Sequence, residues 1–192
     1  VTAASPLFNG NPDYSNFIDK DGVSLFNATE DITKWQRALE ACEEAIQSCE
    51  QAGMKLYTYP GGTFALNDTT ITKMNIRNSV CEQWNSELIW GLSGRTVVDL
   101  QRQTMTYLDP ENIPFGAKGR VAPTLKMAEL FYTENGVPIE EDKTLDFTNK
   151  TALREATHAE RLNLIEGSQT ARINFDREPR FYANLGFVGC TW

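Results

Sequence analysis

The chain has 192 residues, of which 41% are hydrophobic and 23% are charged, and its net charge is −8. A chain of this length can bury a globular core, and its acidity argues against nucleic-acid binding, which requires clustered Lys and Arg to neutralise phosphates. No apolar run is long enough to cross a membrane as a helix.

The most regular pattern in the sequence is an amphipathic helix from Thr33 to Gln51. Thr33 and Gln36 predict a capping box at its start, and Gly53 predicts a left-handed cap at its end. The stripe is rich in small residues, so a neighbouring helix can approach closely, and we expect Val1 to Leu7 to supply it. The apolar residues recur at helical spacing and are Trp35, Ala38, Leu39, Cys42, Ala45, Ile46 and Cys49. We expect Trp35 to lie in the core.

Weaker patterns precede and follow this helix. The long loop from Asn9 to Asp31 carries Tyr14, Phe17, Leu25 and Phe26, which we expect to pin it to the helix pair. The patterns predict short helices over Thr70–Glu82, over Val121–Thr133 with a turn at Glu134–Gly136, and over Thr151–Glu166. They predict strands over Ser86–Leu92 and Phe181–Val188.

Both ends of the chain look cut. It begins VTAASPLFNG without an initiator Met, and it stops at Trp192 directly after a predicted strand. We therefore expect a piece of a longer protein, with any targeting signal outside it.

The four cysteines do not suggest a metal site or a disulfide. None forms a CxxC pair, and Cys42 and Cys49 are two helical turns apart, about 10 Å by rise, which is too far for a disulfide. With one His in the chain, a zinc site is not expected. We interpret the cysteines as small buried hydrophobic residues and predict no metal and no cofactor.

Four stretches in order carry a family resemblance. The opening AASPLFNGN is followed, after the loop, by W-x-x-A-L-x-x-C-x-x-A-I. Asn85 to Gly91 (NSELIWG), Ala122 to Ile139 (APTLKMAELFYTENGVPI) and Asp176 to Trp192 (DREPRFYANLGFVGCTW) come next. Together they resemble the SusD/RagB family of outer-membrane nutrient-binding lipoproteins. The chain departs from the family pattern at Glu129 and Glu178, where Asp is usual, and Thr151 to Thr170 looks like an insertion.

The resemblance implies a fold and a function. The fold is mainly α, with tetratricopeptide-like helix pairs, long loops and a few short strands, incomplete at both ends, and residues 1–192 form a single domain. The implied function is capture of an oligosaccharide or related nutrient at the cell surface and delivery to a SusC-like TonB-dependent transporter, with no catalysis. The protein would be lipid-anchored at the outer membrane, through a Cys outside this chain.

The ligand-binding candidates rest on their local sequence context alone, because the family fixes no aromatic by a motif. Sugar rings present apolar C–H faces, which flat aromatic side chains can cover. The candidates are Trp84, Trp192, Trp90 and Tyr107. A structural role is the simpler interpretation for each, and for Trp90, inside a predicted strand, we expect a core position.

The charged run Asp176, Arg177, Glu178 and Arg180 has two interpretations. It could form a polar rim for sugar hydroxyls, or a salt-bridged turn whose corner is fixed by Pro179. We favour the structural interpretation.

Two other classes of function stay open. A tetratricopeptide-type adaptor that binds a protein or peptide would explain Thr33–Gln51, although no second repeat is visible. A glycosidase needs two carboxylates, but with 26 acidic residues a pair can always be chosen, and no GxSxG, HExxH or phosphate-loop motif occurs. We therefore do not predict an enzyme.

Overall fold

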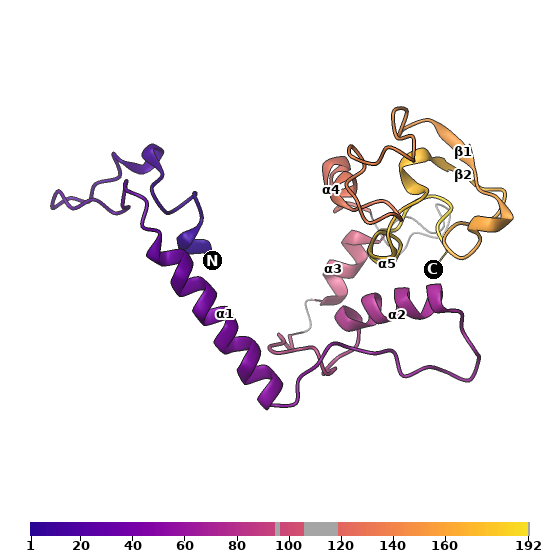
Figure 1. The fold of residues 1–192 in the computed structure, drawn as a ribbon, viewed down its shortest axis with the longest axis horizontal. Helices are drawn as coiled ribbons and strands as arrows, with labels where there is room; N and C mark the ends of the chain where they lie inside the picture. The colour runs from indigo at the N-terminus through magenta and orange to yellow at the C-terminus, as the bar shows by residue number, and fades with distance from the viewer. Residues whose placement is uncertain (95–96, 106–118, 192) are drawn as a thin grey trace. The chain divides into compact units, whose positions relative to one another are not determined.

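The computed structural model describes residues 1–94, 97–105 and 119–191. The chain divides into two compact units, Val1–Lys55 and Leu56–Trp192. The first unit contains the 3-10 helices η1 (Thr2–Ala4) and η2 (Pro12–Tyr14) and the long helix α1 (Thr33–Gln51) (Figure 1). None of the helices in the described part of the chain has the length and apolarity needed to span a bilayer.

The second unit combines short helices with a small two-stranded sheet (Figure 1). Its elements are α2 (Asp68–Cys81), α3 (Val97–Thr104), α4 (Leu125–Leu130), β1 (Leu153–Glu155), η3 (His158–Glu160), β2 (Gln169–Ala171), η4 (Arg172–Asn174) and α5 (Pro179–Asn184). The mainly α fold with long loops and few short strands is therefore confirmed. Tetratricopeptide-type helix pairing and a single domain over residues 1–192 stay predictions.

Helix α1 has the predicted bounds, but only one of its predicted caps is present. The Gly53 N–H donates to the Glu50 carbonyl at 3.0 Å and the Met54 N–H to the Cys49 carbonyl at 2.9 Å, with Gly53 at φ +80°. This is a Schellman motif, so the left-handed cap is confirmed. The capping box is wrong, because the Thr33 hydroxyl donates to the Asp31 carboxylate at 2.7 Å instead.

The apolar stripe of α1 lies largely open to solvent. The exposed fractions of Trp35, Leu39 and Ile46 are 40%, 52% and 59%. Helix η1 packs against α1, but it is only a 3-residue turn and covers little of the stripe. The prediction that Trp35 lies in the core is therefore wrong.

The loop before α1 is held by an amide clamp and a ring cluster. The Asn9 side chain donates to the Asp31 carbonyl at 3.0 Å and accepts from the Asp31 N–H at 2.9 Å. The predicted pinning by loop aromatics is confirmed in part, because the rings pack on one another and on Phe8 rather than on a helix pair. The cluster consists of Phe8, Tyr14, Phe17 and Phe26.

Helix α2 confirms the prediction of a helix over Thr70–Glu82. It also contacts later segments of the second unit through its side chains. It begins at an Asn67 cap, whose side-chain oxygen accepts from the Thr70 N–H at 2.9 Å. It packs against α5, where Arg77 donates to the Tyr182 and Ala183 carbonyls at 3.4 and 3.3 Å. Lys73 is 6% exposed and donates to the Leu162 carbonyl, and burial lowers the pKa of its ammonium group.

The predicted helix over Thr151–Glu166 is wrong. Strand β1 pairs antiparallel with β2, in the register Leu153 with Ala171. Ala156 follows the end of β1, Leu164 forms an isolated antiparallel bridge with Cys190, and both enter the core beside Phe175. The partial helical spacing of these apolar residues was therefore coincidental, because each reaches the same core from a different element.

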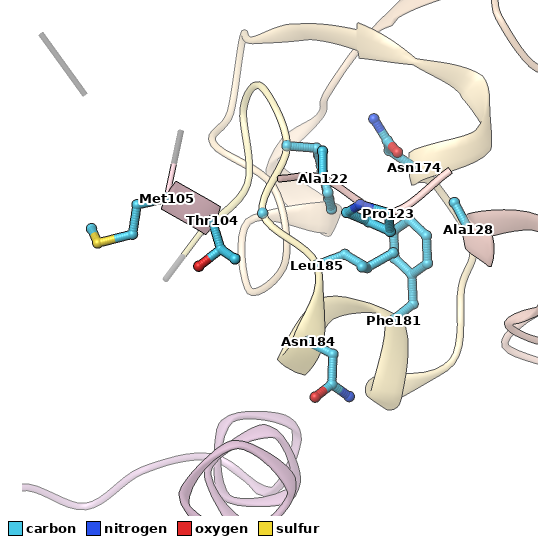
Figure 2. A pocket seen from close by; sticks show the side chains of 11 residues that line it. Thr104, Met105, Ala122, Pro123, Ala128, Asn174, Phe181, Asn184 and Leu185 are labelled. Atoms are coloured by element: carbon cyan, nitrogen blue, oxygen red, sulfur yellow. The ribbon is translucent and has the colours of Figure 1, made fainter. Parts of the chain in front are cut away.

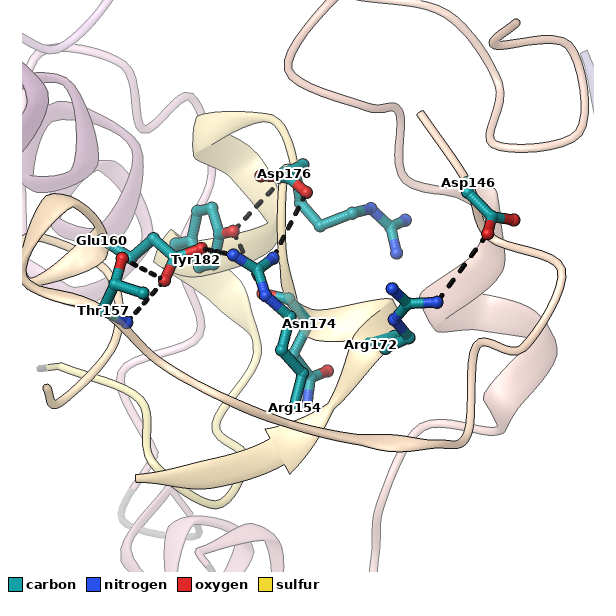
Figure 3. Close-up of polar contacts among 9 residues, drawn as sticks. Asp146, Arg154, Thr157, Glu160, Arg172, Asn174, Asp176 and Tyr182 are labelled. Carbon is teal, nitrogen blue, oxygen red and sulfur yellow. Dashed lines mark hydrogen bonds and ion pairs between the residues drawn. The ribbon is translucent and has the colours of Figure 1, made fainter. Parts of the chain in front are cut away.

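Arg154 on β1 connects the segment after β1 with the residues before α5 (Figure 3). Its guanidinium lies 2.5 Å from a Glu160 carboxylate oxygen and 3.7 Å from one of Asp176, and it covers the Phe175 ring at 4.1 Å. Glu160 also accepts from the Thr157 N–H at 2.7 Å. Burial raises the pKa of Asp176, while the Arg154 charge opposes that shift.

The predicted strand over Phe181–Val188 is also wrong. Pro179 starts α5, in which Phe181, Tyr182 and Ala183 are all buried. A continuous apolar run is typical of a buried strand, but a short helix buried on several faces gives the same run.

The predicted helix over Val121–Thr133 is confirmed only for Leu125–Leu130, with Thr124 as its cap. The turn predicted at Glu134–Gly136 is confirmed by the Gly136 N–H, which donates to the Thr133 carbonyl at 2.9 Å.

Arg177 is the buried centre of the second unit. It is 3% exposed, and its guanidinium donates to four main-chain carbonyls, of Ala128, Phe131, Tyr132 and Ile173, at 2.6 to 3.2 Å. The same group lies 4.5 Å from the centre of the Phe181 ring. Burial lowers the pKa of this guanidinium, although a side chain of this type stays charged.

The residues around Arg177 act as structural supports. Glu178 accepts from the Tyr132 N–H at 2.7 Å and from the Arg180 side chain at 2.6 Å. Thr133 and Arg177 form an antiparallel bridge. The structural interpretation of the charged run is therefore confirmed, except that Arg177 binds carbonyls and not a carboxylate.

A second polar anchor is the Asp142 carboxylate. It accepts from the Asn135 side chain at 3.0 Å, from the buried Thr133 hydroxyl at 2.7 Å, and from the Thr144 N–H at 2.8 Å. These hydrogen bonds, with Asn135 and then Thr133 contributing most, hold the pKa of Asp142 well below its ordinary value of 3.8.

We expect Arg177→Met to lower the free energy of unfolding by at least about 3 kcal/mol, because it removes a buried guanidinium that donates to four main-chain carbonyls. Urea unfolding of the full chain measures this change. Arg180→Met is the matched control, because its side chain is 59% exposed and its pair with Glu178 is worth about 1 kcal/mol or less. Equal losses in the two variants would contradict the central role of Arg177.

We expect Asp142→Asn to flatten the acid limb of the stability profile. The folded pKa of Asp142 lies below the unfolded one, so its contribution is complete above the unfolded pKa and is lost as pH falls below about 4. Thermal unfolding between pH 7 and pH 3 should show wild type and variant converging at low pH. Asp21→Asn, an exposed loop carboxylate, is the control, and parallel wild-type and Asp142→Asn profiles would refute the assignment.

Candidate functional site

The candidate site predicted from Trp84 and Trp90 is an exposed loop directly after α2. We call residues 82–92 the tryptophan loop. It contains turns and bends, so the predicted strand over Ser86–Leu92 is wrong. The Asn85 amide explains the difference, because it donates to the Ser79 and Glu82 carbonyls at 2.9 Å and accepts from the Glu87 N–H at 2.9 Å. A strand would break all three bonds.

The tryptophan loop is also fixed at its centre. The Glu87 carboxylate accepts from the Tyr57 N–H at 2.9 Å, which joins the loop to the segment before α2. Anchors at Asn85 and Glu87 therefore hold the backbone between the two tryptophans on a defined course.

The loop presents both indoles to solvent. Trp84 is 63% exposed and Trp90 is 93% exposed, so the expectation that Trp90 lies in the core is wrong. Trp84 adopts φ +58°, a left-handed conformation that is rare for a bulky residue. Its ring covers Gly91, where an added Cβ would lie 3.4 Å from the indole Cζ3. Ile89 is also exposed, at 73%.

This arrangement suits the apolar face of a sugar ring. Two exposed indoles on a short anchored loop offer flat surfaces for C–H faces, and polar groups nearby can meet hydroxyls. The nearest acidic residues in sequence are Glu82 and Glu87, and residues 82–92 include no Lys or Arg.

The other two predicted site residues cannot be placed. Tyr107 and Trp192 lie outside the described residues. Their ligand-binding roles therefore stay predictions, whereas Trp84 and Trp90 lie on the same exposed loop.

A pocket of about 660 Å³ lies elsewhere in the second unit, and the sequence analysis did not find it (Figure 2). Its walls come from the end of α3, the residues before α4, α4 itself, η4 and the α5 region. Phe181 and Phe187 are among the residues that line it, and their ring centres lie 5.5 Å apart. No sequence signal could have located it, because its lining comes from five separated segments.

The described residues contain no group of three or more His, Cys, Asp or Glu side chains that could hold a metal ion. The four cysteines are free, with Cys42 and Cys81 exposed and Cys49 and Cys190 half-buried. Their interpretation as buried hydrophobic residues is therefore wrong.

Comparison with known proteins identifies a family and a similar solved structure. The sequence model of the SusD family matches residues 64–192. The solved structure of selenomethionine BT4246 superposes with a TM-score of 0.68 at 28% sequence identity. The match covers 94% of this chain and 34% of that chain, so this chain spans about a third of that protein's length. No curated protein matches the chain. Because the family match extends over more than half of its residues, the chain belongs to the SusD family.

Proposed function

We propose that the protein is a glycan-binding subunit of a nutrient-uptake system and that Trp84 and Trp90 form its ligand platform. The observation that carries the proposal is the pair of exposed indoles on one anchored loop, at 63% and 93% exposure, in a chain of the SusD family. Tryptophan is highly buried on average, so two exposed indoles on one short loop are the feature that supports a binding role.

Membership of the SusD family supports a wider role, which is part of this proposal. The protein captures an oligosaccharide or related nutrient at the outer-membrane surface and delivers it to a SusC-like TonB-dependent transporter. A lipid anchor outside this chain holds it there, and the protein catalyses no reaction of its own. Tyr107 and Trp192 are further candidates for the same ligand.

One observation favours a second candidate function. The stripe of α1 leaves Trp35, Leu39 and Ile46 exposed, which suits an adaptor that binds the apolar face of a protein or peptide helix. Retention of peptides together with failure to bind any polysaccharide would favour this adaptor.

The first test is affinity electrophoresis through gels that contain plant, host or microbial polysaccharides. We expect one polysaccharide to retard the full chain, and we expect Trp84→Ala and Trp90→Ala each to weaken retardation by about tenfold, equivalent to about 1.4 kcal/mol. Phe64→Ala is the matched control, because Phe64 is an aromatic that is 82% exposed and lies outside the tryptophan loop.

Each outcome decides a separate point. Retardation that survives both tryptophan substitutions would keep the function and reject the site. Absence of retardation by every polysaccharide would reject glycan capture. Release of reducing ends during incubation would show an enzyme and overturn the binding-only proposal.

We also expect the tryptophan loop to prefer uncharged glycans over uronic-acid polymers. Glu82 and Glu87 repel polyanions at this loop, within a protein of net charge −8. Glu82→Gln should raise affinity for a uronic-acid polymer by about twofold to fivefold at low salt and leave a neutral polymer unaffected. Glu50→Gln on α1 is the control, and tighter binding of the uronic-acid polymer by wild type would contradict the expectation.

A further inference from the structure

We propose that the pocket between α3, α4 and α5 binds a neutral aromatic ring that carries a hydroxyl group, such as a phenol. This site is separate from the tryptophan loop and does not depend on glycan capture. The pocket volume, about 660 Å³, lies within the range of small-molecule sites and exceeds the size of a single ring.

The walls of the pocket are rigid and apolar. Phe181 is 1% exposed and is held by the Arg177 guanidinium at 4.5 Å and the Phe131 ring at 5.7 Å. Pro123 and Phe187 supply further flat surfaces. A flat hydrocarbon ring gains from contact with such walls because both surfaces leave water.

Two segments that line the pocket are also tied to each other. The Gly119 N–H donates to the Met105 carbonyl at 2.8 Å, and the Arg120 and Val121 N–H groups donate to the Gln103 carbonyl at 2.8 and 3.0 Å. These bonds hold the end of α3 against the segment that leads to Ala122 and Pro123, so both lining segments keep their separation.

The ligand should be uncharged. None of the described residues that line the pocket carries an ionisable side chain. A carboxylate, sulfate or ammonium group entering it would lose hydration without gaining a counter-charge.

The polar groups of the pocket mainly offer acceptors. Thr104 donates its only hydroxyl proton to main-chain carbonyls of α3 at 3.1 Å. Asn174 donates to the Thr170 hydroxyl and Asn184 to the Arg180 carbonyl, both at 2.8 Å. Their side-chain oxygens accept no hydrogen bond from the described residues, and Figure 2 shows the two amides on opposite sides of Phe181. The pocket therefore favours a ligand that donates a hydrogen bond.

These requirements favour a phenol over a sugar. A pyranose carries several hydroxyls, and the apolar walls would leave most of them without partners, which costs free energy. A phenol presents one donor and an apolar ring, and it is neutral at pH 7 because its pKa is about 10.

The test uses three matched rings and ¹⁹F NMR on the full chain. 4-Fluorophenol donates a hydrogen bond, 4-fluoroanisole has the same ring without the donor, and 4-fluorobenzoate carries a negative charge. We expect saturable binding of the phenol, about fivefold to tenfold weaker binding of the anisole, and at least about tenfold weaker binding of the benzoate.

Two variants locate the binding. Ala122→Trp fills the pocket and should abolish binding, whereas Val121→Trp, at a neighbouring exposed residue outside the lining, should not. Asn184→Leu removes an exposed acceptor and should reduce the preference for phenol over anisole, with folding checked by near-ultraviolet circular dichroism.

Three results would overturn the proposal. They are absence of saturable phenol binding, binding of the benzoate as tight as that of the phenol, and phenol binding that Ala122→Trp leaves unchanged. Since none of the probes is a sugar, these results are independent of whether the tryptophan loop binds glycans.

Discussion

The second unit depends on one buried cation that satisfies main-chain carbonyls. Arg177 joins the end of α4, the following segment and η4 through four carbonyl oxygens, and it covers the Phe181 ring of α5. Short helices leave many of their last carbonyls without partners. Because α4 and η4 are only 6 and 3 residues long, a forked donor between them replaces the hydrogen bonds that longer helices would make internally.

Sequence patterns predicted the helices that make most of their own hydrogen bonds. Helix α1 repeats its apolar residues over five turns and ends at Gly53, so local chemistry alone defines it. The segment over 151–166 and α5 were assigned wrongly because long-range contacts decide them. Arg154 reaches Glu160 and Asp176, and the Tyr182 hydroxyl donates to the Asn174 carbonyl at 3.0 Å. No local pattern contains those partners.

In the candidate sites, too, the sequence predicts features that depend on local residues and misses those that depend on long-range contacts. Context alone suggested Trp84, because a polar sequence surrounds it, and the structure exposes that side chain. Trp90 was expected in the core because it lies in an apolar run, but the Asn85 amide turns that run into a loop. The pocket was invisible in the sequence, since its walls meet only after α3, α4 and α5 have packed.

The left-handed backbone conformation of Trp84 lowers the stability of the protein, but it belongs to the loop that exposes the indole. A bulky residue at φ +58° costs about 1 kcal/mol or more, and Gly or Asn would occupy the same conformation with less strain. Directed evolution for heat tolerance alone should therefore replace Trp84, whereas evolution under selection for growth on the nutrient should keep it. A consensus sequence designed for thermostability would replace the exposed tryptophan and leave the fold intact.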